Sequence, residues 1–467
     1  MGRKLAEFFR FSERGTSFGI EVVAGLTTFA TMAYIIFLQP AIMSGQLFNM
    51  NTGMDFNALL AGTCVAAAFG SILMGLLANY PIALAPGMGE NFFFVLTALP
   101  LCATVLGVQS GTPETWQLAL GVVFVSGVIF ALLSFLNLRK LLINAVSPSM
   151  KAAIAAGIGL FIAFIGLKNG GLVNIQNNNL SMNHDFRSVS LLVFLIGLAV
   201  TGALQILKVR GGILWGILVA TFSALLLQNF NFGFLEFPAQ EKLLLAFPFS
   251  AEIPSLAPVF AQMDIAGVWT HLAQLAPLIL IFTFMDVFDT LGTMIGVGTQ
   301  AGLIKDNRLP NAERAFAADA IGTVGGAVCG HSTVTSYIES AAGVEHGGRT
   351  GLVAVVTGLC FLAALFCSPL VAMVTRCPAV TAPALVIVGA MMIRNVTRID
   401  WDDYSEALPS FLVLIGIPFT SSIGDGMVIG FIAYPVIKIL SGRPREAGWL
   451  SVGLGALLVI YLCYAKT

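Results

Sequence analysis

The sequence predicts an all-α polytopic membrane protein with about 14 transmembrane segments in a 7+7 inverted repeat. Composition, the spacing of apolar segments and a similarity between the two halves predict this class. Of the 467 residues, 57% are apolar and only 10% are charged, whereas soluble domains carry about 25% charged residues. This composition excludes a soluble enzyme and a disordered scaffold. The net charge of −1 leaves no basic patch for nucleic acid.

Apolar segments recur along the whole chain, and a helix needs about 20 such residues to cross the hydrocarbon. We predict spans at 20–43, 58–78, 82–104, 116–136, 150–168, 188–207, 212–229, 272–298, 314–328, 331–346, 351–372, 379–396, 409–421 and 424–440. The last two are short and could form a re-entrant pair. A further apolar run at 449–465 is either a peripheral helix or an extra span.

The basic residues predict a cytoplasmic N-terminus in the cell (inner or plasma) membrane, because cytoplasmic loops collect Lys and Arg. The N-terminal stretch carries Arg3, Lys4, Arg10 and Arg14. Loops after even-numbered spans are also basic, with Arg139, Lys140, Lys151, Lys208, Arg210, Lys305, Arg308, Arg314, Arg349, Arg394, Arg398, Arg443 and Arg445. The loops after the first and third spans have no basic residue.

The two halves contain similar segments. The segment that begins at Ser147 resembles the one that begins at Cys377, and the segment from Val193 resembles the one from Val413. Seven spans per half is an odd number, so the second copy enters the membrane upside down, as in many transporters with a substrate site near the midplane. We predict a first repeat at 1–230, a connection at 231–271, a second repeat at 272–440 and a C-terminal apolar segment at 441–467.

The third and tenth predicted spans are interrupted at matching places. Pro86 and Gly87 break the third, and the β-branched run Thr333–Thr335 breaks the tenth. We expect a short strand-like stretch in each, with a helix from near Gly87 in the third. Irregular backbone at membrane depth is tolerated only where it lines a cavity or is buried in protein, so these spans mark the predicted binding site.

Ionisable groups inside spans are costly and are therefore functional candidates. Asp286 and Asp289 lie three residues apart, so both can occupy one helix face. Two carboxylates close together in a medium of low dielectric repel, and at least one is expected to hold a proton near neutral pH. This is what proton-coupled transport requires. The alternative is that neighbouring hydroxyls hold both carboxylates for a structural purpose.

Three further residues extend this set. Glu339 in the tenth span can accept two hydrogen bonds from a planar ring with N–H groups, and Asn91 in the third offers a donor and an acceptor. Glu90 faces either a polar interior or a pore wall. Asp319 is interpreted as a tether in a small-residue helix, and a structural role is favoured for His331.

Four segments together resemble one family. They are Glu21–Tyr34, Ala85–Phe93, Asp286–Thr293 and His331–Ser340. In order, and over nearly the whole chain, the sequence resembles the AzgA-like purine permeases, a branch of the nucleobase–cation symporter-2 (nucleobase–ascorbate transporter) superfamily. The resemblance implies a core domain of spans one to four and eight to eleven, a gate domain of the other spans, and antiparallel strands in the third and tenth.

The resemblance also implies symport of adenine, guanine or hypoxanthine with H⁺ as the coupling ion and without a cofactor or metal. The implied substrate-binding residues are Asn91, Asp286, Glu339, Ser332, Thr333 and Phe92, and the implied proton-coupling residues are Asp286, Asp289 and Glu339. Glu90 stands where the family is often apolar, and Gln39 stands where Asn-Pro is usual; both bear on substrate preference.

Two other classes of function remain as alternatives. An anion permease or exchanger of the same architecture would hold sulfate or a carboxylate at helix N-termini, but acidic residues at the site would repel it. A channel or an intramembrane enzyme is the other class, although neither a Ser–His pair nor HExxH occurs in any span. Beyond membrane lipid, the expected partner is a second copy, since small-residue faces of the gate could form a homodimer.

Overall fold

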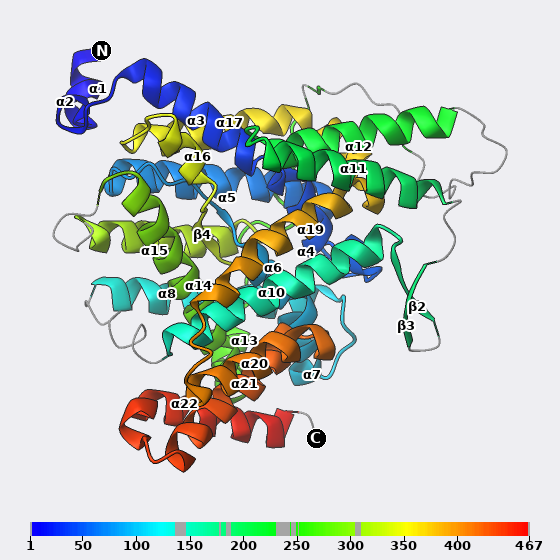
Figure 1. Ribbon diagram of the computed structural model, residues 1–467, viewed down its shortest axis with the longest axis vertical. Helices are drawn as coiled ribbons and strands as arrows, with labels where there is room; N and C mark the ends of the chain where they lie inside the picture. The colour runs from blue at the N-terminus through cyan, green and yellow to red at the C-terminus, as the bar shows by residue number, and fades with distance from the viewer. Residues whose placement is uncertain are drawn as a thin grey trace. The chain divides into compact units, whose positions relative to one another are not determined.

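The computed structural model describes residues 2–135, 146–176, 179–183, 188–229, 243, 249–250, 252–303 and 310–465. Most of them form helices (Figure 1). The basic residues Arg139, Lys140, Lys305 and Arg308 lie outside these ranges. The same is true of most residues of 231–251, the first part of the predicted connection. The orientation predicted from the charged loops therefore stays a prediction.

The chain divides into two compact units, each built from separated parts of the sequence. Unit 1 contains Met1–Phe94, Gln109–Lys140 and Phe247–Val371, and unit 2 contains Val95–Val108, Leu141–Ala246 and Ala372–Thr467. This division agrees with the expected core and gate domains, except that the second half of the third span belongs to unit 2. Each unit draws on both predicted repeats, whose boundaries stay a prediction.

Unit 1 is built from the N-terminal part of the chain and two later stretches. Its helices are α1 (Gly2–Phe8), α2 (Phe11–Arg14), α3 (Phe18–Met32), α4 (Ile35–Met43), α5 (Phe56–Leu77), α6 (Met88–Phe93), α8 (Pro113–Phe135), α13 (Ile265–Thr270), α14 (Leu272–Gln300), α15 (Ala312–Val328), α16 (Ser340–Glu345) and α17 (Leu352–Ala364). Its strands are β1 (Leu84–Pro86) and β4 (Val334–Ser336). The short helix α18 (Ser368–Thr375) spans the boundary with unit 2.

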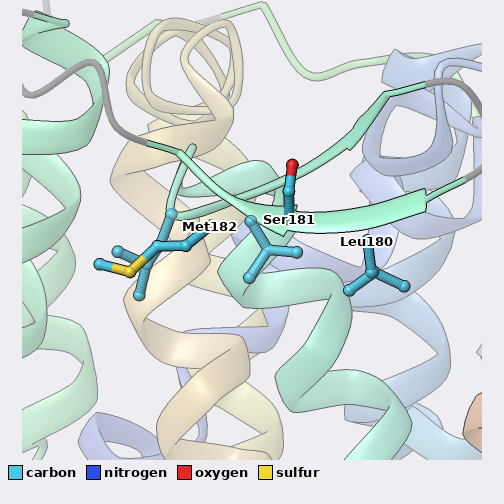
Figure 2. Close-up of a pocket in the computed structure, with 5 residues that line it drawn as sticks. Leu180, Ser181 and Met182 are labelled. Atoms are coloured by element: carbon cyan, nitrogen blue, oxygen red, sulfur yellow. The ribbon is translucent and has the colours of Figure 1, made fainter.

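Unit 2 contains the remaining helices and a β-hairpin. The helices are α7 (Leu99–Leu106), α10 (Pro148–Asn169), α11 (Val189–Ile206), α12 (Gly212–Asn229), α19 (Pro378–Ile393), α20 (Tyr404–Thr420), α21 (Ile423–Leu440) and α22 (Pro444–Ala465). The hairpin pairs β2 (Val173–Gln176) with β3 (Asn179–Met182). A pocket on this hairpin, lined by Leu172, Val173, Leu180, Ser181 and Met182, contains no ionisable side chain (Figure 2).

Ten helices among the described residues are long and apolar enough to cross a membrane. They fall within a few residues of predicted spans, and α3 and α4 together form the first, Phe18–Met43. Of the two segments predicted to be short, α21 has 18 residues and reaches a spanning length, whereas α20 has 17. The total of fourteen spans stays a prediction.

Polar side chains begin several of these helices. The first N–H groups of a helix lack partners within the helix, and in an apolar environment water cannot replace them. Asp55 Oδ1 accepts from Ala58 N at 2.8 Å to begin α5, and Ser147 Oγ accepts from Met150 N at 3.2 Å to begin α10. Such caps are worth about 1 kcal/mol each.

The interruptions of the third and tenth spans form one two-stranded sheet. Strand β1 pairs with β4 antiparallel, with Ala85 opposite Thr335. Two bonds extend the ladder beyond the strands: Gly87 N donates to Thr333 O at 2.9 Å, and Tyr337 N donates to Ala83 O at 3.0 Å. Helix α6 begins at Met88, directly after the strand. The prediction of strand-like stretches in these two spans is confirmed.

Side-chain hydroxyls satisfy backbone groups on the outer edges of both strands. Ser71 Oγ on α5 accepts from Leu84 N and donates to Leu84 O, both at 2.9 Å. Thr323 Oγ1 on α15 accepts from Val334 N at 3.1 Å and lies 3.2 Å from Val334 O. An open sheet edge is costly at membrane depth because no water is present to bond the backbone. These two hydroxyls, together with that of Tyr337, which donates to Pro86 O at 2.5 Å, therefore support a sheet of three-residue strands there.

We expect the substitution Ser71→Ala to destabilise the protein, because it leaves the buried N–H and C=O of Leu84 without partners. Each unsatisfied buried group costs about 1–3 kcal/mol, so the melting temperature of the purified protein should fall clearly. Ser126→Ala is the matched control, since Ser126 is equally buried but its hydroxyl bonds only Val123 O of its own helix. Equal melting temperatures for the two variants would contradict the role given to Ser71.

Candidate functional site

Polar side chains that are buried within unit 1 gather around β1, β4 and the adjoining helices. Burying such groups without partners is unfavourable, and here they form three sets. We call them the amide network (Gln39, Asn91, His331 and Ser332), the carboxylate network (Glu90, Asp286, Thr290, Asp319, Thr323 and Ser336) and the open pair (Asp289 and Glu339). All three belong to unit 1.

The amide network links α4 and α6 to the residues before β4. Gln39 Nε2 donates to Asn91 Oδ1 at 2.9 Å, and Asn91 Nδ2 donates back to Gln39 Oε1. Ser332 Oγ donates to the same Asn91 Oδ1. His331 Nδ1 lies 3.0 Å from Gln39 Nε2. All four side chains have an exposed fraction of 0%, so these bonds, rather than water, determine their orientations.

The carboxylate network links α14 and α15 to β4. Asp319 Oδ2 accepts from Thr290 Oγ1 at 2.5 Å, and Asp319 Oδ1 accepts from Ser336 Oγ at 2.7 Å. Asp286 Oδ2 accepts from Thr323 Oγ1 at 2.7 Å. Asp286 Oδ1 is buried and has no hydrogen-bond partner among the described residues. Asp319 thus has a donor for each oxygen, whereas Asp286 has one oxygen left over.

Thr323 connects this network to the sheet edge. Its hydroxyl lies within hydrogen-bond distance of both Asp286 Oδ2 and Val334 O. A hydroxyl has a single hydrogen, so a stronger bond to one acceptor weakens the bond to the other. A negative charge on Asp286 would therefore weaken the bond between the Thr323 hydroxyl and Val334 O at the edge of β4.

The open pair is more accessible than the two networks. Glu339 directly precedes α16 and is half-buried, and Tyr34 OH donates to Glu339 Oε1 at 2.7 Å. Asp289 on α14 is exposed and interacts electrostatically with Glu339. These two carboxylates are therefore the more accessible acidic groups of the three sets.

The two aspartates that the spacing puts on one helix therefore have different surroundings. Asp286 is buried at 1% exposure and bonded to Thr323, whereas Asp289 is exposed, is bonded to Thr335 of β4 and interacts electrostatically with Glu339. Glu90, whose surroundings the sequence left open, is buried and folds back over Gly87: a Cβ on Gly87 would lie 2.3 Å from Glu90 Oε2. Its environment is the polar interior.

The other predicted substrate-binding residues occupy different surroundings. Ser332 bonds Asn91, as described above. Thr333 is fully buried, and its Oγ1 has no partner within the described part of the chain. Phe92 is also fully buried, and its ring lies 5.5 Å from that of Phe48 in an edge-to-face contact.

The sequence alone did not indicate Thr323 or Tyr34 as site residues, and it indicated no hydrogen-bond partner for Gln39. A threonine in a small-residue helix and a tyrosine in an apolar span carry no distinguishing signal. For Asp319, the interpretation as a tether fits its two hydroxyl donors. Glu90 carries the same signal as Asp286 and Glu339, because it too is an acidic residue within a predicted span.

Chemically, the site offers acceptors for N–H groups at the open pair and an incompletely bonded carboxylate at Asp286. The neutral donors and acceptors of Asn91 and Ser332 complete it. The arrangement suits binding of a polar, N–H-rich molecule and proton exchange.

Similarity to known proteins extends over nearly the whole chain. The Permease family model (Xan_ur_permease) matches residues 19–428. The chain is 42% identical over 467 residues to the guanine/hypoxanthine permease PbuG of Bacillus subtilis (strain 168), covering 98% of this chain and 99% of PbuG. It is 36% identical over 458 residues to the adenine permease AdeQ of Escherichia coli (strain K12), covering 98% of this chain and 95% of AdeQ.

Solved structures share the fold. The transmembrane domain of a cyanobacterium bicarbonate transporter, BicA, aligns with a TM-score of 0.61 at 15% identity, over 88% of this chain and 96% of that domain. SLC26A9 aligns with a TM-score of 0.62 at 12% identity, over 90% of this chain and 65% of that protein. At these identities the likeness concerns the fold alone, and it confirms the predicted inverted-repeat architecture with core and gate domains.

The family match and the relatives also confirm the predicted resemblance to nucleobase–cation symporters and the assignment as a transporter rather than an enzyme. The ten apolar helices are those of a multi-pass membrane protein. The chain therefore belongs to the Permease family.

Proposed function

We propose that this permease imports purine nucleobases (adenine, guanine or hypoxanthine) in symport with protons. Relatives that are 36–42% identical over at least 97% of this chain are named as guanine/hypoxanthine or adenine permeases. Identity at this level over the whole length supports a shared substrate class. The proposed substrate-binding residues are Asn91, Asp286, Ser332, Thr333, Phe92 and Glu339.

The observation that carries the proposal is the position of Glu339. It directly precedes α16 and closely follows β4, half-buried, with Tyr34 holding one carboxylate oxygen. A carboxylate can accept several hydrogen bonds, and bonds to an ionised acceptor are about twice as strong as neutral ones. Purine bases present N–H groups along their edges, so Glu339 suits them as the main acceptor.

Asp286 is the proposed proton-coupling group, together with Asp289 and Glu339. Asp286 is buried, one oxygen lacks a partner among the described residues, and its described bond comes from the neutral hydroxyl of Thr323. An incompletely bonded carboxylate in a low-dielectric interior is stabilised when it takes up a proton. Protonation would also release the Thr323 hydrogen to Val334 O, which links the proton to the strand beside the substrate.

We further propose alternating access, with the core carrying the site past the gate. Every proposed substrate-binding and proton-coupling residue lies in unit 1. Substrate and proton would therefore bind to the same compact body and move with it. The acidic residues of this site argue against an anion as the substrate, since like charges repel strongly in a low dielectric.

The first test is Glu339→Gln, which keeps the size of the side chain and removes its charge. We expect uptake of labelled hypoxanthine, guanine and adenine to fall by about 10- to 100-fold, because a hydrogen bond to a charged group is worth about 1.5–3 kcal/mol. Glu345→Gln is the matched control: it makes the same change at an exposed position at the end of α16, the helix that Glu339 precedes. Normal accumulation by Glu339→Gln, at wild-type abundance, would remove Glu339 from the site.

The second test is Asp286→Asn, which fixes this group in a neutral form. We expect net accumulation of purine to be abolished, whereas exchange of internal for external purine persists because exchange needs no net proton movement. Reconstituted vesicles with an imposed pH gradient distinguish the two activities. Concentrative uptake by Asp286→Asn that still collapses with a protonophore would rule out Asp286 as the coupling group.

The third test compares Thr323→Ser with Thr323→Val. Serine keeps the hydroxyl between Asp286 and Val334, so the dependence of uptake on external pH should match that of the wild type. Valine removes the hydroxyl at nearly constant volume, and uptake should fall by about tenfold or more and lose that dependence, because a buried backbone group and a carboxylate both lose a partner. A wild-type pH profile for Thr323→Val would show that Thr323 does not couple the two.

A further inference from the structure

His331 is fully buried in the amide network, and the proposed transport mechanism gives it no part. The sequence makes specific room for its ring at Gly62 on α5. A Cβ on Gly62 would lie 2.8 Å from His331 Nε2 and 2.5 Å from Cys329 O, closer than real contacts allow. The imidazole is therefore held against the backbone of α5.

The contacts of His331 determine which ring nitrogen carries the hydrogen. Nε2 lies 2.9 Å from Leu59 O and 3.3 Å from Thr63 Oγ1, and the Thr63 hydroxyl donates its own hydrogen to Leu59 O at 2.8 Å. Leu59 O can only accept, so Nε2 carries a hydrogen. The ring is fully buried among neutral hydrogen-bond partners, and burying a charge without an ionic partner is costly. The ring is neutral, with a lone pair on Nδ1.

This tautomer determines the orientation of the Gln39 amide. One hydrogen of Gln39 Nε2 bonds His331 Nδ1 and the other bonds Asn91 Oδ1. Gln39 Oε1 is then left to accept from Asn91 Nδ2. Turning the Gln39 amide over would place its oxygen against the His331 lone pair, which is repulsive in a buried site.

The orientation of Asn91 follows in turn. Both lone pairs of Asn91 Oδ1 are occupied, by Gln39 Nε2 and by Ser332 Oγ. One of the two Nδ2 hydrogens bonds Gln39 Oε1. The amide therefore keeps one N–H for any further partner and has no remaining acceptor.

We propose that His331 is a positioning residue that makes Asn91 a hydrogen-bond donor only, and thereby requires an acceptor on the purine where it meets Asn91. This inference rests on the proposed function. The acceptor is a ring nitrogen without hydrogen or an exocyclic oxygen. Without His331 Nδ1, the Gln39 and Asn91 amides can turn together, and Asn91 can accept as well as donate.

The test measures how strongly unlabelled hypoxanthine and its deaza analogues inhibit uptake of labelled hypoxanthine. The 1-, 3-, 7- and 9-deaza compounds each replace one ring nitrogen by C–H, and O6 is tested with purine itself. In the wild type, removing the acceptor that faces Asn91 should weaken inhibition by about tenfold, the value of one well-formed hydrogen bond. We call this ratio the acceptor contrast.

Two substitutions of His331 separate a positioning role from a structural one. Asparagine can present an oxygen near the position of Nδ1, so His331→Asn keeps the acceptor for Gln39 and should keep the acceptor contrast. Glutamine can present a nitrogen near the position of Nε2, so His331→Gln keeps the bond to Leu59 O and should reduce the contrast to less than about threefold. If His331 served only as a structural tether to Leu59, His331→Gln would keep the acceptor contrast and His331→Asn would reduce it.

Two further variants keep the test decisive if substitutions of His331 fail to fold. Gln39→Met removes the orienting amide without touching the bond between His331 and Leu59, and should also reduce the contrast to less than about threefold. Thr63→Val is the control beside the ring and should keep it. Wild-type contrast in His331→Gln or Gln39→Met, or its loss in His331→Asn, would overturn the inference. Wild-type protein that takes up no purine would instead overturn the proposed function.

Discussion

Backbone groups at membrane depth must find partners within the protein, and the candidate site of this permease depends on how two short strands meet that requirement. Strands β1 and β4 bond each other, and the hydroxyls of Ser71, Thr323 and Tyr337 bond backbone groups on their outer edges. The strands in turn place Asn91 on the helix that follows β1 and Glu339 just beyond β4. A sheet edge satisfied by a side chain rather than by a third strand leaves room for carboxylates nearby.

The three polar sets have different kinds of bonding and therefore different capacities. In the amide network every orientation is fixed by neutral hydrogen bonds, which suits selection of a ligand by its donors and acceptors. In the carboxylate network both oxygens of Asp319 have donors, whereas one oxygen of Asp286 has none among the described residues. Protonation is therefore more favourable at Asp286 than at Asp319. The open pair is the accessible part, which suits first contact with substrate. All three sets lie in the same compact unit, as the proposed alternating-access movement requires.

Much of this arrangement could be predicted from the sequence, because its strongest signals are physical costs. Acidic residues within apolar spans identified Asp286 and Glu339, and Pro86 with the β-branched run near Val334 predicted the strands. The partners of these residues could not be predicted. Thr323 meets Asp286 across 37 positions, and Gln39 meets His331 across 292; such contacts depend on how helices pack, which no local pattern encodes. The same limit explains why the end of the third span was expected in the core yet lies in unit 2.

The central claim is that Asp286 changes its protonation when purine binds, with Thr323 passing the change to the sheet. Infrared difference spectroscopy of the purified protein, with and without hypoxanthine, measures this directly through the C=O stretch of protonated carboxyl groups. The account predicts a carboxyl band that changes on adding hypoxanthine, disappears in Asp286→Asn and is shifted in Thr323→Val. Hypoxanthine binding with no change in any carboxyl band, or with the same change in Asp286→Asn, would contradict it.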